Sequence, residues 1–362
     1  MVKIRAATLF LQPPSWESQA LRSYVETRAS RFAEVVEDLG LGGVVWSLRL
    51  SFPPPPQDVE TERLAENITS SMEGSGVRYA AALHLDASDR RARELVDVLP
   101  AYPLYSSLRT PRFEDLKPAA KLILDVSRRD PLAAARLAID LQGSGLLTPY
   151  FPLSSNIAGR EGLAVALLYA DALLEGVKTG TLESKIRETL EWAEGVGLRL
   201  SSTLGVEFFG VDASPSPWMD ESVARVVEIL SGVAIPEPGT FTALRRLNEA
   251  VWRGSVAIRS TGFNETMLPV AEDNVLKERV REGSLNVRDL VALTASCVAG
   301  VDMVVLPSDT DHRLIEGILA DQKTIVSIKG RPLGSRLIVY EGAAPGDYVE
   351  LGFFGKVPVI GV

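Results

Sequence analysis

The sequence predicts an α/β fold, built either as one large α/β barrel or as a doubly wound sheet. Apolar runs of strand length, about eight to ten in number, mostly alternate with segments of helical periodicity. The chain has 362 residues, of which 46% are hydrophobic, so it is long enough to bury a large core. No repeat, low-complexity linker or block of like charge marks a domain boundary. We therefore expect residues 1–362 to form a single domain, and at this point both the barrel and the doubly wound sheet stand.

The clearest strand–turn–helix unit lies within residues 287–322. Residues 301–306 are an apolar run of the kind that forms a strand buried on both faces. A polar turn follows, and the next segment has one apolar helical stripe. In a parallel sheet such a turn lies at the carboxyl end of its strand, where α/β proteins bind their ligands. The turn consists of Ser308, Asp309 and Thr310.

In the first half of the chain, short apolar runs predict strands, and apolar residues that recur every three or four positions predict helices. The predicted strands are residues 3–11, 44–52 and 78–85, and residues 102–108 are predicted to be a short strand or an extended loop. The predicted helices are residues 17–38, 60–72, 89–98, 114–127, 131–141, 162–177 and 182–196. The last two helices form a longer insertion than a simple β–α repeat requires.

The second half continues the alternation and then ends in strands. Further strands are predicted at residues 203–211, 255–260, 267–270 and 301–306, with helices at residues 223–230 and 241–252. Beyond the helix that follows the polar turn, strands are predicted at residues 324–328, 335–340, 348–351 and 357–360. Gly and Pro turns separate them, so we expect a β-rich C-terminal tail.

Composition and charge exclude several classes of function. Lys and Arg total 38 against 47 Asp and Glu, and the formal charge of -9 argues against a nucleic-acid or anionic-membrane partner. No run approaches the roughly 20 apolar residues of a membrane helix, and the first apolar run is interpreted as a strand rather than a signal peptide. We expect a cytoplasmic protein with a small-molecule ligand. Homo-oligomer formation is left open.

The basic residues are strongly biased towards arginine. Arg outnumbers Lys 29 to 9, and Asn, Gln, Cys and Met are sparse. This bias would suit a protein that works at high temperature. Genomic base composition would produce the same bias, so both interpretations stand.

Four segments resemble a known family. They are FFGVDASPSP from Phe208, MLPVAEDN from Met267, LTASCVAGVDMVVLPSDT from Leu293 and GDYVELGFFGKVPVIGV from Gly346. In these segments the chain resembles the uncharacterised proteins grouped as domain of unknown function 711, which are labelled pyruvate formate-lyase-like. The resemblance implies a single large α/β barrel like the ten-stranded barrel of glycyl radical enzymes, in a family whose biochemical activity is not stated.

The resemblance does not extend to glycyl radical chemistry. Glycyl radical enzymes carry a glycine in an Arg-Val-x-Gly-aromatic setting near their C-terminus. The tail of this chain has Gly352, Gly355 and Gly361 but no arginine in the required place. We therefore find no glycyl radical motif and do not expect an active glycyl radical enzyme.

Polar residues directly follow three predicted strands, and in a barrel they would converge on its carboxyl face. Clustered carboxylates raise one another's pKa and can act as acid and base, or together bind a divalent cation. We therefore predict Asp212, Glu272, Asp273 and Asp309 as catalytic residues, or as metal ligands if a metal binds. Ser214, Ser308 and Thr310 are predicted ligand-binding residues. The alternative is that each residue caps the following helix.

Other polar residues lie outside these three groups. Asn156 lies in a polar loop and His312 in the first turn after residue 309, and both are predicted to bind ligand. By strand alternation His84 could face a barrel lumen. Asp302 is expected to make a buried structural hydrogen bond. Cys297, the only cysteine, is expected to be a buried residue without a catalytic role.

These observations predict a soluble enzyme that acts on a small polar metabolite by carboxylate acid–base chemistry at the carboxyl face of the barrel. The reaction is open between hydrolase and lyase. The alternative is a non-catalytic metabolite-binding or regulatory protein, which needs the same pocket but no base poised near neutrality. The chain matches no phosphate-loop or dinucleotide fingerprint, so no nucleotide cofactor is inferred.

Overall fold

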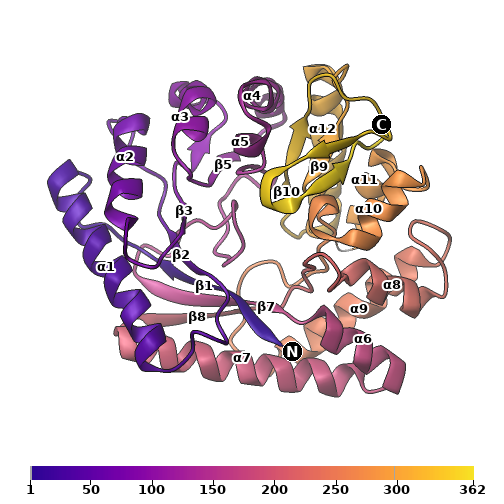
Figure 1. Ribbon diagram of the computed structural model, residues 1–362, viewed down its shortest axis with the longest axis horizontal. Coiled ribbons are helices and arrows are strands. Elements are labelled where there is room, and N and C mark those ends of the chain that lie inside the picture. The colour runs from indigo at the N-terminus through magenta and orange to yellow at the C-terminus, as the bar shows by residue number, and fades with distance from the viewer. Residues whose placement is uncertain (1, 297) are drawn as a thin grey trace.

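The computed structural model describes residues 2–296 and 298–362 as a mixed α/β fold with several sheets. Figure 1 shows the helices arranged around the outside of the molecule and the strands within. Among the described residues, no helix is both long and apolar enough to cross a membrane. The helices are α1 (Ser18–Asp38), α2 (Thr61–Met72), α3 (Leu95–Ala101), α4 (Leu116–Arg129), α5 (Pro131–Ala134), α6 (Ala170–Thr179), α7 (Leu182–Leu204), α8 (Val223–Ser231), α9 (Thr240–Ser255), α10 (Asn274–Arg281), α11 (Val287–Leu293) and α12 (His312–Lys329).

The strands form separate sheets. They are β1 (Lys3–Phe10), β2 (Leu48–Ser51), β3 (Tyr79–Ala81), β4 (Leu85–Asp86), β5 (Ser106–Arg109), β6 (Leu137–Asp140), β7 (Gly162–Leu168), β8 (Glu207–Asp212), β9 (Val304–Leu306), β10 (Gly334–Ser335), β11 (Leu337–Val339), β12 (Tyr348–Glu350) and β13 (Lys356–Pro358). One sheet has the order β3-β2-β1-β7-β8 and another β10-β6-β5-β4. β11 pairs with β9, and β12 with β13.

In the five-stranded sheet β1 pairs in parallel with β2 and antiparallel with β7, and the other pairings of this sheet are parallel. Isolated bridges such as Ala81↔Tyr105 and Pro269↔Asp302 connect the separate pieces. In the part of the chain described here the strands thus make an interrupted ring and not a closed barrel. The ten-stranded barrel is not confirmed, although the α/β class is.

The main core lies between the five-stranded sheet and the helices outside it. Leu9 of β1 and Leu50 of β2 are fully buried in the same hydrophobic cluster as Leu21 and Val25 of α1. These two α1 positions are four apart, so they lie on one face of the helix. The sheet is therefore held from outside by apolar packing, and smaller apolar clusters lie on its other face.

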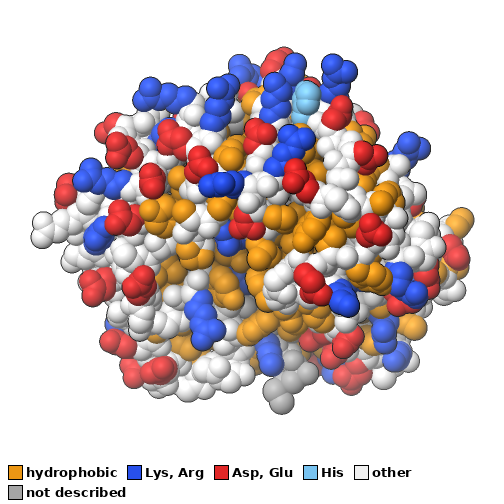
Figure 2. Space-filling view, turned by 45° about the horizontal axis from the view of Figure 1, so that its top comes forward, with side chains coloured by type: hydrophobic (Ala, Val, Ile, Leu, Met, Phe, Trp, Pro, Cys, Tyr) orange, Lys and Arg blue, Asp and Glu red, His pale blue; other side chains and the backbone are white. Residues whose placement is uncertain are grey.

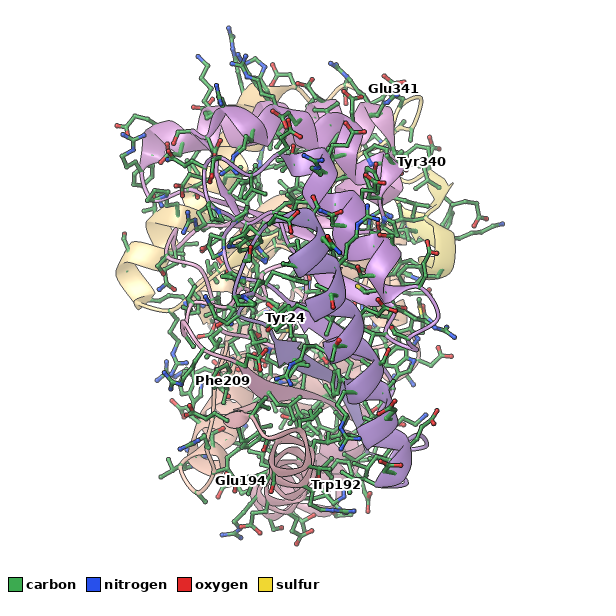
Figure 3. The ribbon with its side chains drawn as sticks, turned by 90° about the vertical axis from the view of Figure 1, so that its left-hand side faces the viewer. Tyr24, Trp192, Glu194, Phe209, Tyr340 and Glu341 are labelled. Atoms are coloured by element: carbon green, nitrogen blue, oxygen red, sulfur yellow. The ribbon has the colours of Figure 1, made fainter. Side chains whose placement is uncertain are left out.

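The inner face also contains a smaller aromatic contact. The rings of Phe10 and Phe209 lie 5.5 Å apart, edge to face, and a Cβ at Gly162 would come within 2.2 Å of the Phe209 ring. Glycine is therefore required at the start of β7. In Figure 3, which labels Phe209, α1 crosses the near side of the molecule, and Trp192 of α7 lies towards the lower end.

Several predicted elements were wrong. Residues 162–177, expected as one helix, form β7 and then α6, and residues 131–141 form one helical turn followed by β6. Both strands are buried along their whole length, and a short run that is apolar on all sides does not distinguish a strand from a buried helix by periodicity. Residues 324–328, expected as a strand, belong to α12.

The segments 255–260 and 267–270 are also not strands. Each contributes only an isolated bridge to a neighbour, as at Val211↔Ser260 and Pro269↔Asp302. Predicted strand 203–211 begins later, because α7 extends through Leu204. The β-rich tail is confirmed by β10 to β13, and β9 is shorter than the apolar run that contains it.

Candidate functional site

A cavity of about 480 Å³ lies at the centre of the molecule and is called the central cavity below. Figure 2 shows hydrophobic side chains gathered around a hollow across the middle of the face it displays, while charged side chains crowd towards the edge. The charged residues that line the central cavity are Arg5, Arg49, Arg78, Glu272, Asp302 and Arg336. Its main aromatic residues are Trp46, Tyr79, Tyr105, Tyr150, Phe151, Trp218, Phe263, Phe353 and Phe354.

The central cavity is at the amino-terminal ends of β1, β2 and β3, where Arg5, Arg49 and Tyr79 lie. Because β7 is antiparallel to β1, this is also the side of the carboxyl ends of β7 and β8, and Ser216 and Trp218, which follow β8, line the cavity. Arg336 directly precedes β11, and Asp302 lies two residues before β9. The sequence prediction placed the site at the carboxyl ends of all the strands. The cavity is instead at the opposite end of β9 from the polar turn at residues 308–310.

A register shift in β1 directs Arg5 into the central cavity. Ile4 pairs with Leu167 of β7 and Ala6 pairs with the adjacent Ala166, so Arg5 is an extra residue in β1. A bulge of this kind bends the strand and re-aims a side chain. Arg5 is only 7% exposed, although it lies in a run that is otherwise apolar.

Four charged side chains form a buried network in the cavity wall. Arg5 Nη2 donates to Glu272 Oε2, and Arg336 Nη2 donates to Glu272 Oε1 at 3.0 Å. Arg336 also donates from Nε and Nη2 to the two oxygens of Asp302 at 2.6 and 2.7 Å. Two guanidinium groups thus face two carboxylates, and within this network the formal charges cancel.

The network fixes the protonation state of Glu272. Burial by itself would raise the pKa of this carboxyl, but Arg5 and Arg336 outweigh it and hold the pKa below its usual range. Both oxygens of Glu272 accept a hydrogen bond from an arginine. Glu272 is therefore an ionised carboxylate with little tendency to take up a proton.

Arg49 and the exposed Arg78 are the two lining cations outside the network, and Arg49 is the less exposed of them. Its Nε donates to Ser47 Oγ at 3.0 Å, and its guanidinium lies over the rings of Phe151 and Tyr79, with Cζ at 5.1 and 5.8 Å from their centroids. No carboxylate of residues 2–296 and 298–362 forms an ion pair with it. Burial, and next the charge of Arg5, lower the pKa of Arg49 to about 10, so it stays protonated at neutral pH.

Only one of the four predicted carboxylates, Glu272, lines the central cavity. Asp212 is fully buried at the end of β8 and accepts hydrogen bonds from Thr148 Oγ1, Ser214 N and Oγ, Phe263 N and Asn264 N. Burial raises the pKa of Asp212 and these bonds oppose the rise. Because both oxygens are already occupied, Asp212 fastens the loop at residues 261–264 to β8.

Glycine is required beside Asp212. Gly262 has a φ of +78°, and a Cβ there would lie 2.0 Å from Asp212 Oδ2. The loop can approach the carboxylate closely only because this position has no side chain. Ser214, a predicted ligand-binding residue, binds the other oxygen of the same carboxylate: its Oγ donates to Asp212 Oδ1 at 2.6 Å.

Asp273 has a comparable structural position. It caps α10 by accepting from Val275 N at 2.9 Å, and it also binds Ser222 Oγ at 2.6 Å and Ala224 N at 3.0 Å. One carboxylate therefore joins the start of α10 to the start of α8. This is the helix-cap alternative that the sequence left open for these residues.

The polar turn after β9 lies outside the lining of the central cavity. Ser308 and Asp309 are exposed, whereas Thr310 is buried. Asp311, not Asp309, caps α12, and it accepts from Arg313 N and Leu314 N, each at 2.9 Å. His312 is the first residue of α12 and is half-buried. The structure does not bring this turn together with Asp212, Glu272 or Asp273, and its role in ligand binding stays a prediction.

Of the remaining predicted residues, Asn156 and His84 are not part of the cavity lining, whereas Asp302 is. Asn156 is buried and fastens its loop by donating to Leu11 O at 2.7 Å and Arg160 O at 3.0 Å. His84 is 1% exposed and shares a hydrogen bond with Ser107 Oγ at 2.8 Å, and burial lowers its pKa to about 4. It does not face a lumen. Asp302 lines the cavity and pairs with Arg336, and Cys297 lies outside the described residues.

A metal site is not formed by the predicted carboxylates. Among residues 2–296 and 298–362, no three or more His, Cys, Asp or Glu side chains are grouped so that they could hold a metal ion. Asp212 and Asp273 have both oxygens occupied by hydrogen bonds.

The sequence reasoning missed the arginines. Arg5, Arg49 and Arg336 each interrupt an apolar run, in IRAATLF, LRLSF and SRLIVY. A charged residue inside a strand that is otherwise buried is seldom tolerated unless it is paired or functional. This signal was present in the sequence and would have identified the cavity wall.

The comparisons with known proteins relate most of the chain to one family. The family model described as "Uncharacterised ACR (DUF711)" matches residues 109–352. The matched part contains Glu272, Asp302 and Arg336, whereas Arg5 and Arg49 precede it.

Several proteins named UPF0210 are similar in sequence. One from Methanopyrus kandleri is 39% identical over 199 residues, which cover 52% of this chain and 44% of that protein. One from Pyrobaculum arsenaticum is 31% identical over 266 residues, which cover 68% of this chain and 58% of that protein. One from Clostridium acetobutylicum is 38% identical over 172 residues, which cover 46% of this chain and 38% of that protein. The chain thus spans about half the length of the curated relatives it matches.

A solved structure of an anaerobic ribonucleotide reductase is similar at a lower level. The match covers 99% of this chain and 76% of that chain, with 10% sequence identity and a TM-score of 0.41. A TM-score of this size does not relate the two folds in detail.

Proposed function

This chain belongs to the uncharacterised DUF711 family, and we propose that it binds a small anionic metabolite in the central cavity with Arg49 as the anchor. The observation that carries the proposal is the state of Arg49. Its neighbours Arg5 and Arg336 are matched by Glu272 and Asp302, whereas no carboxylate in the described ranges pairs with Arg49.

An unpaired guanidinium in a cavity wall is costly for the protein alone. Moving a charge out of water disfavours the charged form, as the lowered pKa of Arg49 shows. A bound anion would offset that cost, because a guanidinium offers parallel N–H donors that match two oxygens of a carboxylate or phosphate. Neither Nη atom of Arg49 donates to another described residue, so both are free for such a ligand.

The neutralised network supports this role. Because Arg5 and Arg336 hold Glu272 and Asp302, these carboxylates do not turn towards Arg49. The cavity lining therefore keeps two arginines without a carboxylate partner among the described residues, the anchor Arg49 and the exposed Arg78. Its volume of about 480 Å³ lies within the range of pockets that bind small metabolites.

An enzyme is the second candidate, and Tyr105 is the residue that favours it. Its hydroxyl has no hydrogen-bond partner among the described residues, and burial raises its pKa, with Arg49 and Arg336 opposing the rise. A tyrosine hydroxyl beside an anion site can supply a proton in a hydrolase or lyase reaction, and the positive charges of Arg49 and Arg336 favour this because they lower its pKa against the effect of burial. Glu272, which both arginines keep ionised, is the poorer proton carrier. Tyr105→Phe should then retain anion binding and lose turnover.

The binding function is tested by titrating the protein with inorganic phosphate and with acetate in isothermal calorimetry. We expect saturable binding of at least one anion, with loss of binding in Arg49→Met. The matched control is Arg187→Met, which removes an exposed arginine from α7. Binding that is unchanged in Arg49→Met would refute the proposal, and so would the absence of binding by the unmodified protein.

A further inference from the structure

The aromatic side chains of the central cavity form two walls that the anion function alone does not require. The tryptophan wall consists of Trp46, Trp218, Phe353 and Phe354, and the tyrosine wall of Tyr79, Tyr105 and Phe151. Each wall is assembled from segments that are distant in the sequence. Both line the same cavity as Arg49.

The tryptophan wall is continuous. The Trp46 and Trp218 ring centroids lie 5.1 Å apart, and Trp218 stacks on Phe353 at 6.1 Å with an angle of 25° between the rings. Phe353 and Phe354 lie 4.1 Å apart. Arg5 sits over this wall, with Cζ at 5.8 Å from the Trp46 centroid and 5.7 Å from that of Trp218.

The tryptophan wall is fixed in place and yet partly uncovered. Phe354 is buried, and Lys277 Nζ donates to its carbonyl oxygen at 3.0 Å. The adjacent Phe353 is 62% exposed and Trp46 is 45% exposed. Large aromatic surfaces that remain open at the rim of a pocket mark a place where an apolar partner packs.

The tyrosine wall surrounds the anchor itself. The ring centroid of Tyr105 lies 5.3 Å from that of Phe151 and 6.1 Å from that of Tyr79. Arg49 is placed over Phe151 and Tyr79, so rings already occupy positions beside its guanidinium. A ligand whose anionic group reaches Arg49 therefore has aromatic faces next to the rest of its body.

We propose that the ligand of the central cavity is a planar-ring anion, a carboxylate or phosphate attached to an aromatic or heteroaromatic ring. The anionic group pairs with Arg49, and the ring packs against Trp218 and Phe353. This inference rests on the proposed anion-binding function and specifies its ligand class. The cavity volume of about 480 Å³ is much larger than a free phosphate or acetate ion and leaves room for the ring.

The test compares probes that differ only in the ring. Phenyl phosphate is compared with inorganic phosphate, and benzoate with acetate and with cyclohexanecarboxylate, by isothermal calorimetry of the full chain. We expect each aromatic probe to bind about tenfold more tightly than its ring-free partner. Benzoate should also bind more tightly than cyclohexanecarboxylate, because a flat ring stacks on Trp218 and Phe353 whereas a puckered ring does not.

Two variants separate the ring contact from the anion contact. Trp218→Leu and Phe353→Leu should each reduce the preference for the aromatic probes and leave the affinity for inorganic phosphate unchanged. Phe353 is largely exposed, so its substitution is compatible with folding even if that of Trp218 is not. Trp192→Leu on α7, a partly exposed tryptophan that is not part of the cavity lining, is the control and should change neither affinity.

The outcomes distinguish the two proposals. Inorganic phosphate that binds through Arg49, with no gain from the ring, would overturn the planar-ring proposal and leave the anion function standing. If Phe353→Leu lowered the affinity for phenyl phosphate and for inorganic phosphate equally, the planar-ring proposal would also be overturned. Absence of anion binding, or binding unaffected in Arg49→Met, would overturn the anion function and this extension together.

Discussion

Arg336 and Glu272, which are 64 residues apart in the sequence, meet in the wall of the central cavity, where Arg336 Nη2 donates to Glu272 Oε1 at 3.0 Å. The same carboxylate accepts from Arg5 at the other end of the chain. One buried glutamate thereby joins β1 to the segment before β11. Its substitution tests how far the cavity depends on this network.

Glu272→Gln should lower the free energy of unfolding by about 3–5 kcal/mol, because it leaves two buried arginines without one of their partners. The folded state lowers the pKa of Glu272, so its contribution is present above the ordinary glutamate value of 4.5 and is lost as the pH falls through the lower folded value. Urea unfolding measured at pH 7 and at low pH checks both points.

The control for Glu272 is Glu66→Gln. Glu66 pairs with Arg22 at 3.5 Å, and the two side chains are 57% and 46% exposed. A solvent-screened pair of this kind should contribute less than about 1 kcal/mol. A similar loss in both variants would show that the cavity network has no special stabilising role.

Asp212→Asn should destabilise the fold without weakening anion binding. An asparagine replaces one acceptor oxygen with an NH₂ group, which cannot accept from Thr148 or Phe263. Leaving such buried donors unpaired costs about 1–3 kcal/mol. Urea unfolding and phosphate titration on the same preparation measure the two effects. Loss of phosphate binding without loss of stability would show that Asp212 takes part in the binding site.

Asp309→Ala should leave both thermal stability and anion binding nearly unchanged, because Asp309 is exposed and lies outside the cavity lining. The neighbouring Asp311→Ala is the matched comparison, since Asp311 caps α12. Its loss should lower the midpoint of thermal unfolding by a few degrees. Loss of phosphate binding in Asp309→Ala alone would support the site predicted from the sequence.

His84→Gln should flatten the pH dependence of stability between pH 6.5 and 4. Burial lowers the pKa of His84 from 6.5 to about 4. Between these two pH values the unfolded chain binds a proton at His84 and the folded protein does not. Stability contributed by the neutral ring is complete above pH 6.5 and is lost as the pH falls, by about 3 kcal/mol in total. Urea unfolding across this window measures the slope.

The slope is attributed to His84 because its side chain is 1% exposed. If His84→Gln leaves the slope of stability against pH unchanged, burial of His84 is not its cause.

The sequence by itself determined the α/β class and most of the longer helices. α1 and α2 have apolar residues at helical spacing over many turns, and that spacing depends only on local geometry. The same local rules failed for β7 and β6, because a short run that is apolar on every side fits a buried strand and a buried helix equally well. Pairing of β7 with β1 and β8 decided between them.

Only the tertiary structure decided where the cavity lies and which residues line it. The sequence identified Glu272 but grouped it with Asp212, Asp273 and Asp309, because all four follow predicted strands. The structure shows hydrogen-bond donors around Asp212 and Asp273, and it places Glu272 in the cavity wall between Arg5 and Arg336.

The physical reason is the range of the contacts involved. An apolar run indicates burial through its own residues, and that information is local. Arg5 and Glu272 are 267 positions apart and meet only because an extra residue in β1 turns Arg5 towards the segment that follows Pro269. Neither residue type reveals its partner, so the sequence determined the elements, and the register between distant strands decided the site.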